Sequence, residues 1–169
     1  MIREGRCWVF GDDISTDLLY PQVAYTLPLP EAAQLVFRAN RPGWSELVRE
    51  GDVIVGGRNF GSGSSRPATV LLLELGIRAV VADSFSPLFL RNCVNFALPG
   101  LECPGVSAAV REGETVRIDL ATGLVEGLER GVRLAGRPLP AELLRIVEDG
   151  GVLASLEARG LIEPAEGGR

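Results

Sequence analysis

The stretch that most constrains the fold runs from Val53 to Arg66 and reads V-I-V-G-G-R-N-F-G-S-G-S-S-R. It begins with three β-branched residues, which favour a buried strand. The glycines that follow let the backbone adopt positive φ and approach a ligand closely. The apolar run after them predicts a helix over Pro67 to Leu75, and Ala79 to Ala82 predicts a second buried strand. This order predicts two parallel strands joined by a right-handed crossover.

The glycine-rich loop has the features of an anion site. Ser64 and Ser65 stand where a helix N-cap is expected, and the first N–H groups of a helix can hold an anion. Arg66 can grip a carboxylate with two hydrogen bonds. A nucleotide phosphate loop is disfavoured because it requires a lysine, and the dinucleotide motif is disfavoured because Arg66 replaces its third glycine. From these residues alone, an ordinary glycine turn with a serine N-cap is the alternative.

The segments before this loop are less regular. Cys7 to Phe10 predicts a short strand, which leads into a polar loop from Gly11 to Asp17. That loop resembles the start of a calcium-binding loop, but leucine at the sixth position and alanine at the twelfth exclude such a site. Aspartates that cap a turn are the alternative there. Tyr20 to Pro30 predicts an ordered loop or flap because of its three prolines, and Glu31 to Ala39 predicts a short helix.

The remaining segments complete an α/β pattern. Ser45 to Glu50 predicts one helical turn that packs through Trp44 and Leu47, and Ser86 to Phe96 predicts a helix capped by Ser86. Further strands and helices are predicted at Gly100 to Pro104, Thr115 to Leu120, Leu124 to Leu128, Gly131 to Leu134, Ala141 to Val147 and Val152 to Arg159. Because no repeat or linker divides the chain, residues 1–169 are expected to form a single domain.

Composition excludes several classes of function. The chain has no histidine and no lysine, so it cannot supply a serine–histidine or cysteine–histidine pair, a histidine metal site or a lysine Schiff base. The net charge of −5 disfavours sequence-independent binding of nucleic acid. Cys7, Cys93 and Cys103 form no C-x-x-C pair, which favours buried thiols over a cluster held by this chain. No signal peptide or membrane-length apolar run is found, which predicts a cytoplasmic protein.

Three motifs carry a resemblance to a known family. They are F-G-D-D-I-S-T-D at residues 10–17, G-G-R-N-F-G-S-G-S-S-R at 56–66 and A-D-S-F-S-P-L-F-L-R-N-C-V-N-F-A-L-P at 82–99. In order and spacing they resemble the small subunit of 3-isopropylmalate dehydratase, and the aconitase swivel domain looks similar. The resemblance covers Cys7 to Pro104 strongly and the remainder loosely. It implies an α/β fold of the three-layer β/β/α swivelling type, with a mainly parallel core sheet and additional short C-terminal strands.

The same resemblance implies an activity. The family is a hydro-lyase of two subunits, which implies isomerisation of an alkylmalate such as 3-isopropylmalate, in leucine biosynthesis, by dehydration and rehydration. It implies a large-subunit partner that carries a [4Fe–4S] cluster, while this chain alone binds no metal. It also implies a small hydroxy-diacid as the substrate, with no nucleic acid and no membrane as partners.

The resemblance assigns roles to individual residues. In this family the first serine of S-S-R takes a proton from carbon, which implies that role for Ser64, and Asp17 matches an active-site position that helps to orient partners. Because a serine hydroxyl is a weak acid, we expect a helix N-terminus, backbone N–H groups and a guanidinium to favour its alkoxide. Asn59 and Arg91 are expected to support the loop and the fold. Substrate-binding roles are implied for Gly63, Ser65, Arg66, Tyr25 and Thr26.

The sequence departs from the family at two places. Pro67 and Ala68 replace the usual Glu-His, which removes a negative charge from the first helical turn. The flap from Gln22 to Leu29 is apolar, with no arginine before Arg38, which favours an alkyl-bearing malate over homocitrate or homoaconitate. A smaller substrate such as a methylated malate or citraconate is equally compatible.

Alternatives of other classes are a non-catalytic anion-binding or regulatory module with the same fold, and a stand-alone enzyme that uses serine or aspartate without metal.

Overall fold

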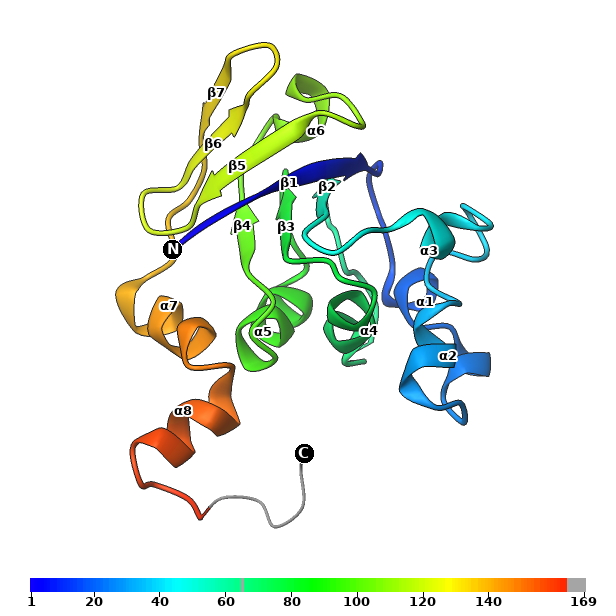
Figure 1. Ribbon diagram of the computed structural model, residues 1–169, viewed down its shortest axis with the longest axis vertical. Helices are drawn as coiled ribbons and strands as arrows, with labels where there is room; N and C mark the ends of the chain where they lie inside the picture. Colours follow the sequence, from blue (N-terminus) through cyan, green and yellow to red (C-terminus); the bar gives the residue numbers. More distant parts are fainter. Residues whose placement is uncertain (65, 164–169) are drawn as a thin grey trace.

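The computed structural model describes residues 1–64 and 66–163, which form an α/β fold on one seven-stranded sheet (Figure 1). The strand order is β4-β3-β2-β1-β5-β6-β7. The four strands of the parallel half are β1 (Ile2–Val9), β2 (Val53–Gly56), β3 (Ala79–Ala82) and β4 (Gly100–Glu102). The three strands of the antiparallel half are β5 (Thr115–Asp119), β6 (Leu124–Gly127) and β7 (Val132–Ala135).

Strand β1 joins the two halves because its two ends pair in opposite senses. Its second part runs parallel to β2, with Cys7 beside Val53, whereas its first part runs antiparallel to β5, with Arg6 beside Thr115. The strand is therefore longer than the predicted Cys7 to Phe10, because residues 2–6 gain a partner from far along the chain. The predicted parallel pairing of the strands on either side of the first helix is confirmed by the pairing of β2 with β3.

Helices cover one face of the parallel strands, and the antiparallel strands rise on the other side (Figure 1). The helices near the candidate site are α1 (Thr16–Leu19), the 3-10 helix η1 (Gln22–Ala24), α2 (Leu29–Ala33), α4 (Ala68–Glu74) and α5 (Pro87–Asn95). The other helices are α3 (Trp44–Leu47), α6 (Val106–Ala109), α7 (Ala141–Glu148) and α8 (Val152–Ala158). The predicted Tyr20 to Pro30 loop thus contains η1 and the start of α2.

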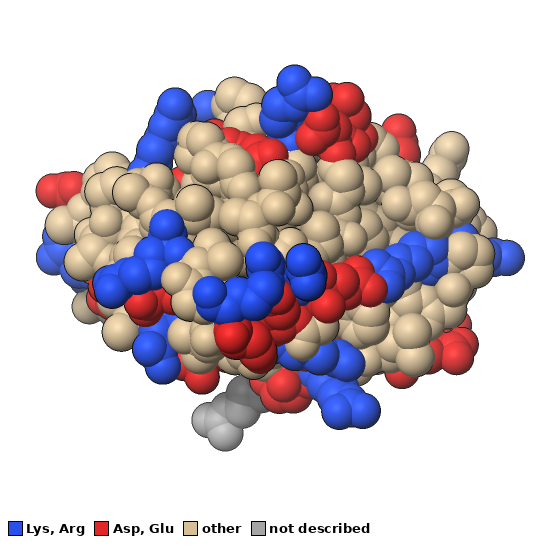
Figure 2. Space-filling model, turned by 90° about the horizontal axis from the view of Figure 1, so that it is seen from above, with Lys and Arg blue, Asp and Glu red and all other residues tan. Residues whose placement is uncertain are grey.

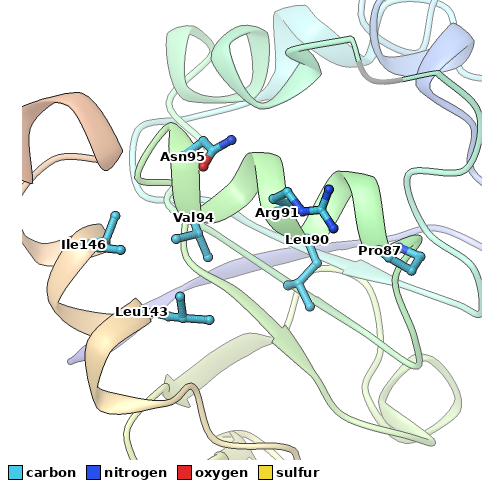
Figure 3. Close-up of a pocket in the computed structure, with 7 residues that line it drawn as sticks. All are labelled: Pro87, Leu90, Arg91, Val94, Asn95, Leu143 and Ile146. Atoms are coloured by element: carbon cyan, nitrogen blue, oxygen red, sulfur yellow. The ribbon is translucent and has the colours of Figure 1, made fainter.

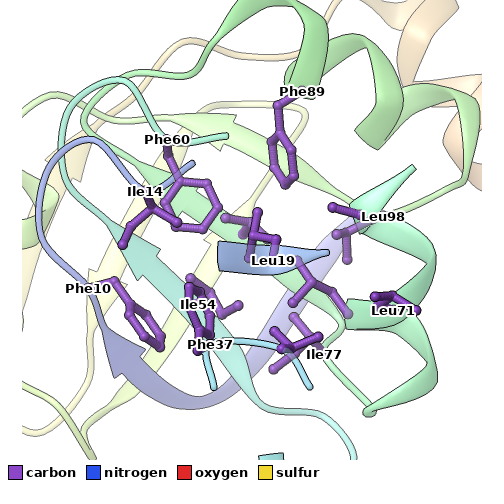
Figure 4. Packing of buried hydrophobic residues seen from close by; sticks show 14 of the residues in the cluster. Phe10, Ile14, Leu19, Phe37, Ile54, Phe60, Leu71, Ile77, Phe89 and Leu98 are labelled. Atoms are coloured by element: carbon purple, nitrogen blue, oxygen red, sulfur yellow. The ribbon is translucent and has the colours of Figure 1, made fainter. Parts of the chain in front are cut away.

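Two hydrophobic cores occupy the two faces of the parallel strands. Ile54 and Val80 lie in the helix-side core, together with Leu71 of α4 and the aromatic side chains drawn in Figure 4. The residues that flank Ile54 and Val80 along β2 and β3 lie in the other core, against Ile118 of β5; they are Val53, Val55, Ala79 and Val81. Successive strand residues alternate between faces, so β2 and β3 are buried at every position and their sequences are continuously apolar. This arrangement confirms the predicted three-layer β/β/α fold.

The predicted helix from Glu31 to Ala39 is too long. Helix α2 ends at Ala33, and Phe37 adopts a φ of 58°. The N–H of Phe37 donates to the carbonyl of Leu18 instead of continuing a helix, and its ring stacks on Phe10 at 3.9 Å between centroids. Long-range burial of an aromatic ring therefore overrides local helix propensity here.

One prediction about packing is wrong, and one about a helix cap is confirmed for its position alone. Leu47 was expected to pack beside Trp44, but 57% of Leu47 is exposed while Trp44 is buried. Ser86 is the N-cap residue of α5, yet its side chain makes no capping hydrogen bond.

Asp52 is the one buried carboxylate among the described residues, and it holds the start of β2. Its oxygens accept hydrogen bonds from Arg6 Nη2 at 2.6 Å, Trp8 Nε1 at 2.7 Å and the Arg49 N–H at 2.9 Å. Burial alone would raise the pKa of this carboxyl, but the combined hydrogen bonds from Arg6, Arg49 and Trp8 outweigh it and lower the pKa. Asp52 is therefore held as an anion that ties β1 to the loop before β2.

Charges of both signs alternate over the face shown in Figure 2, with no broad patch of one sign. Many of the arginines are paired, for example Arg41 with Glu112 and Arg137 with Glu102. No helix among the described residues combines the length and apolarity needed to cross a membrane.

Candidate functional site

The first two motifs lie side by side at the carboxyl ends of β1 and β2. The N–H of Gly61 donates to the Ile14 carbonyl at 2.7 Å, and the N–H of Thr16 donates to the Ser62 carbonyl at 2.7 Å. A parallel bridge also joins Ser15 to Ser62. The polar loop and the glycine-rich loop therefore form one structural unit, at the strand ends where parallel sheets collect ligands.

Side chains tie the same two loops together. Asp12 accepts hydrogen bonds from Arg58 Nε at 2.9 Å and Nη2 at 2.6 Å, and these bonds lower the pKa of the Asp12 carboxyl. The amide of Asn59 donates to Asp13 at 2.9 Å, and Asn59 adopts a φ of 58°. Asp12 and Asp13 thus cap and brace loops, and Asn59 supports the loop as expected.

The third motif, residues 82–99, packs against the glycine-rich loop and holds it through hydrogen bonds. The N–H of Phe60 donates to the Ser84 carbonyl at 3.0 Å, and the side-chain amide of Asn92 donates to the carbonyl of Arg66 at 3.1 Å. Gly61 lies against Phe89 of α5 so closely that a Cβ at position 61 would be 2.1 Å from Phe89 Cγ. All three motifs therefore converge on the segment that carries Ser64 and Arg66.

Arg66 is held from several sides. Its Nη1 atom forms an ion pair with Asp17 and donates to the carbonyl of Tyr20 at 3.1 Å. Its guanidinium carbon lies 5.0 Å from the ring centroid of Tyr25, a cation–π distance. The Arg66 side chain is 25% exposed, while Asp17 is 71% exposed and Tyr25 45%. The structure thus brings together three of the residues that the resemblance singled out.

Ser64 is exposed, and its backbone is fixed by a residue that sequence reasoning did not single out. The N–H of Ser64 donates to Oγ1 of Thr16 at 3.1 Å. Thr16 itself is buried, with 1% exposed. Its position inside the I-S-T-D motif, directly before Asp17, is the one sequence signal that could have identified it.

The expected helix N-cap at Ser64 and Ser65 is wrong for Ser64, and Ser65 lies outside the described residues. Helix α4 begins at Ala68, its N-cap is Pro67, and no side chain caps it. Ser64 therefore lies outside the first helical turn. At that distance from the helix, the influence of the helix dipole has already fallen off. The N–H groups of Gly61, Ser62 and Ser64 are also bonded within the protein. The positive charge that the described part of this segment carries is the guanidinium of Arg66, which pairs with Asp17.

The two remaining site residues are Gly63 and Thr26, whose partners among the described residues do not include a side chain that is hydrogen-bonded to them. Gly63 adopts a φ of 107° and is exposed, which suits a position that a ligand approaches closely. Thr26 follows Tyr25 and is exposed, and its hydroxyl makes no hydrogen bond to the residues that the structure describes.

The surface around these residues is hollowed on the Asp17 side. A hollow of about 280 Å³ is lined by Asp17, apolar side chains of α1 and the flap, and Arg38. A different hollow of about 390 Å³ lies between α5 and α7, as Figure 3 shows. Its wall contains none of the candidate residues, so this hollow is separate from the candidate site.

The described part of the chain offers no ready metal centre. Within residues 1–64 and 66–163, no three histidine, cysteine, aspartate or glutamate side chains are grouped to hold a metal ion. Cys7, Cys93 and Cys103 are buried free thiols, as expected. Burial raises the pKa of each thiol, to about 11 for Cys7 and Cys103, which keeps them protonated and disfavours metal ligation.

Comparisons with known proteins agree on one group of relatives. Residues 39–105 match the Aconitase C-terminal domain family. The chain is 44% identical to 3-isopropylmalate dehydratase small subunit 1 of Methanopyrus kandleri over 94% of this chain and 95% of the relative. It is 41% identical to the isopropylmalate/citramalate isomerase small subunit of Methanocaldococcus jannaschii, again over 94% and 95%. The crystal structure of 3-isopropylmalate dehydratase from the same archaeon superposes with a TM-score of 0.88 at 33% identity, covering 96% of this chain and 98% of that one.

Proposed function

Because this chain belongs to the family of 3-isopropylmalate dehydratase small subunits, which are hydro-lyases of the aconitase superfamily, we propose that it isomerises an alkylmalate together with a large subunit. Family membership confirms the resemblance that the three motifs indicated. The observation that carries the proposed site is the convergence of those motifs on Ser64 and Arg66.

Arg66 binds a substrate carboxylate in this proposal. A guanidinium has five N–H donors, and both hydrogen bonds that Arg66 makes to described residues come from Nη1. The Nη2 and Nε groups remain for a forked pair of hydrogen bonds to a carboxylate. Asp17 and the ring of Tyr25 contact the guanidinium. We therefore assign Asp17 to orienting Arg66 and not to proton transfer.

Ser64 takes the proton from the substrate carbon in this proposal. The electrons of the broken C–H bond form a carbon–carbon double bond as the neighbouring hydroxyl group leaves, and water then adds in the opposite sense to give the isomer. The exposed side chain of Ser64 is accessible to a substrate, and Arg66 supplies positive charge that favours the alkoxide. Gly63, Ser65 and Thr26 complete the proposed substrate-binding set.

The departing hydroxyl needs an acid or a metal. A [4Fe–4S] cluster supplies a Lewis acid for this hydroxyl when it is bound. The described residues of this chain do not fit such a cluster, because the thiols are buried and no group of ligands is assembled. We therefore assign the cluster to the large subunit. The same free thiols support a reducing, cytoplasmic location, and the continuous seven-stranded sheet of the described residues supports a single swivel-type domain.

The flap favours a substrate with an alkyl side group. Val23, Leu27 and Leu29 are 60%, 36% and 41% exposed, so the flap offers apolar surface near Tyr25. Overall identity does not decide the substrate, because relatives named for isopropylmalate, for isopropylmalate and citramalate together, and for homoaconitase match almost equally well, at 44%, 41% and 40%. We propose 3-isopropylmalate as the preferred substrate. Arg38 shares a hollow with Asp17, so a carboxylate-bearing side group is the competitor to test.

The test is turnover by the small subunit mixed with its large iron–sulfur subunit. We expect activity only in the mixture, and faster turnover of 3-isopropylmalate than of homoaconitate or citraconate. Ser64→Ala is expected to lower kcat by a factor of about 100 to 10,000 while the two subunits still assemble. Ser86→Ala is the matched control, because the Ser86 side chain makes no capping bond and lies outside the proposed site. Normal turnover by Ser64→Ala would place the base elsewhere, and faster turnover of homoaconitate would contradict the substrate.

A further inference from the structure

Thr16 bonds to the backbone on both sides of Gly63. Its N–H donates to the Ser62 carbonyl at 2.7 Å, and its Oγ1 accepts from the Ser64 N–H at 3.1 Å. The side chain is buried, with 1% exposed, although it belongs to a polar loop. A buried hydroxyl is retained where it makes hydrogen bonds that the fold needs.

The segment from Ser62 to Ser64 curves around this hydroxyl. Gly63 adopts a φ of 107°, and a Cβ at that position would lie 2.9 Å from Thr16 Oγ1. The contact is therefore too close for any residue with a side chain. Helix α4 starts only at Ala68, so regular secondary structure does not restrain Ser64.

We propose that Thr16 is a positioning residue, which sets the place of Ser64 through the hydrogen bond to its N–H. This inference rests on the proposed function, because it gives Ser64 the role of the base. Without the Thr16 oxygen, the Ser64 N–H loses its hydrogen-bond acceptor. The glycine-rich loop then also loses the hydrogen bond that joins Ser64 to α1. A shift of about 1 Å at a reacting group can lower a rate by about 100-fold. Binding by Arg66 depends on Asp17, Tyr20 and Tyr25, so KM is expected to change little.

The sharpest test compares Thr16→Ser with Thr16→Cys in the assembled two-subunit enzyme. Both variants lose the methyl group of Thr16, and they differ only in the γ atom of the side chain. That atom is an oxygen in Thr16→Ser and a sulfur, which is a weak hydrogen-bond acceptor, in Thr16→Cys. Thr16→Ser is expected to keep kcat within about threefold of the wild type, while Thr16→Cys lowers it by about 10- to 100-fold with KM nearly unchanged. Thr16→Val, which keeps the shape of the side chain, is expected to resemble Thr16→Cys.

A second measurement does not depend on activity. Hydrogen exchange of the Ser64 amide, followed by NMR in the small subunit, is expected to be faster in Thr16→Cys than in Thr16→Ser. Equal kcat values for the two variants, or equal exchange rates, would overturn the inference. If Ser64→Ala is inactive while Thr16→Cys has normal turnover, the positioning role fails and the proposed function stands. If Ser64→Ala is active, the base is misassigned and the positioning role falls with it.

Discussion

The contact between Gly61 and Phe89 offers a quantitative test of how the fold supports the candidate site. Gly61 adopts a φ of 78°, and a Cβ there would lie 2.1 Å from Cγ and 2.3 Å from Cβ of Phe89. These atoms are at the base of a side chain that is only 1% exposed, so rotation cannot relieve the clash. Gly61→Ala therefore combines two penalties: a left-handed backbone for alanine and an overpacked core.

Each penalty has a known scale. The left-handed conformation costs a residue with a Cβ roughly 1–2 kcal/mol, and overpacking costs roughly 1–3 kcal/mol. We expect Gly61→Ala to lower the free energy of unfolding by roughly 2–5 kcal/mol. Gly105→Ala is the matched control, because Gly105 also has a positive φ, of 86°, but a Cβ at that position would meet nothing within 4 Å. Its expected loss is the backbone part alone, about 1–2 kcal/mol.

Urea unfolding of the small subunit measures both losses, and kcat of the assembled enzyme measures the effect on the site. Gly61→Ala is expected to lower kcat as well, because the neighbouring Ser62 anchors the loop that carries Ser64, whereas Gly105→Ala keeps kcat. Phe89→Ala removes Cγ and Cδ2, two of the three atoms that the new Cβ would meet, so it is expected to offset part of the Gly61→Ala loss. Equal losses in the two glycine variants, or strict additivity in the Gly61→Ala, Phe89→Ala double variant, would refute the reasoning.

Further predictions follow from the charged and thiol groups. Asp52→Asn is expected to lower the free energy of unfolding by roughly 2–4 kcal/mol at pH 7, because a buried anion that pairs with Arg6 is lost. The pKa of Asp52 is lowered on folding, so its contribution to stability is full above the unfolded pKa of about 3.9 and fades as pH falls through the folded value. The free energies of unfolding of the wild type and of Asp52→Asn, measured from pH 7 to 3, should therefore converge at low pH. A difference between them that stays constant over this range would contradict the prediction. Arg66→Lys is expected to raise KM for the diacid by about tenfold or more, since an ammonium lacks the forked donor pair, and an unchanged KM would argue against carboxylate binding there. The three buried thiols are expected to react slowly with an aromatic disulfide reagent at pH 8 until urea unfolds the chain, and fast reaction of the folded protein would contradict their burial.

The sequence by itself determined the parallel core and the family. The β-branched runs at Val53 and Ala79, separated by glycines and a helical apolar stretch, specify a strand–helix–strand unit through local propensity and periodicity. The absence of histidine and lysine restricts the chemistry that this chain can supply, and three motifs in order identify its relatives. These properties depend on residue types and short spacings, which can be read directly along a chain.

Only the tertiary structure decided how the candidate residues are held. Nothing local to Ser64 indicates that α4 starts at Ala68, or that a threonine 48 positions earlier accepts its N–H. The same holds for Phe37, which leaves a helical pattern to stack on Phe10, and for Arg66, which pairs with Asp17 and lies over Tyr25. These contacts arise between segments far apart in sequence, where burial and hydrogen bonding outweigh local preference, so they exist only once the loops at the strand ends have come together.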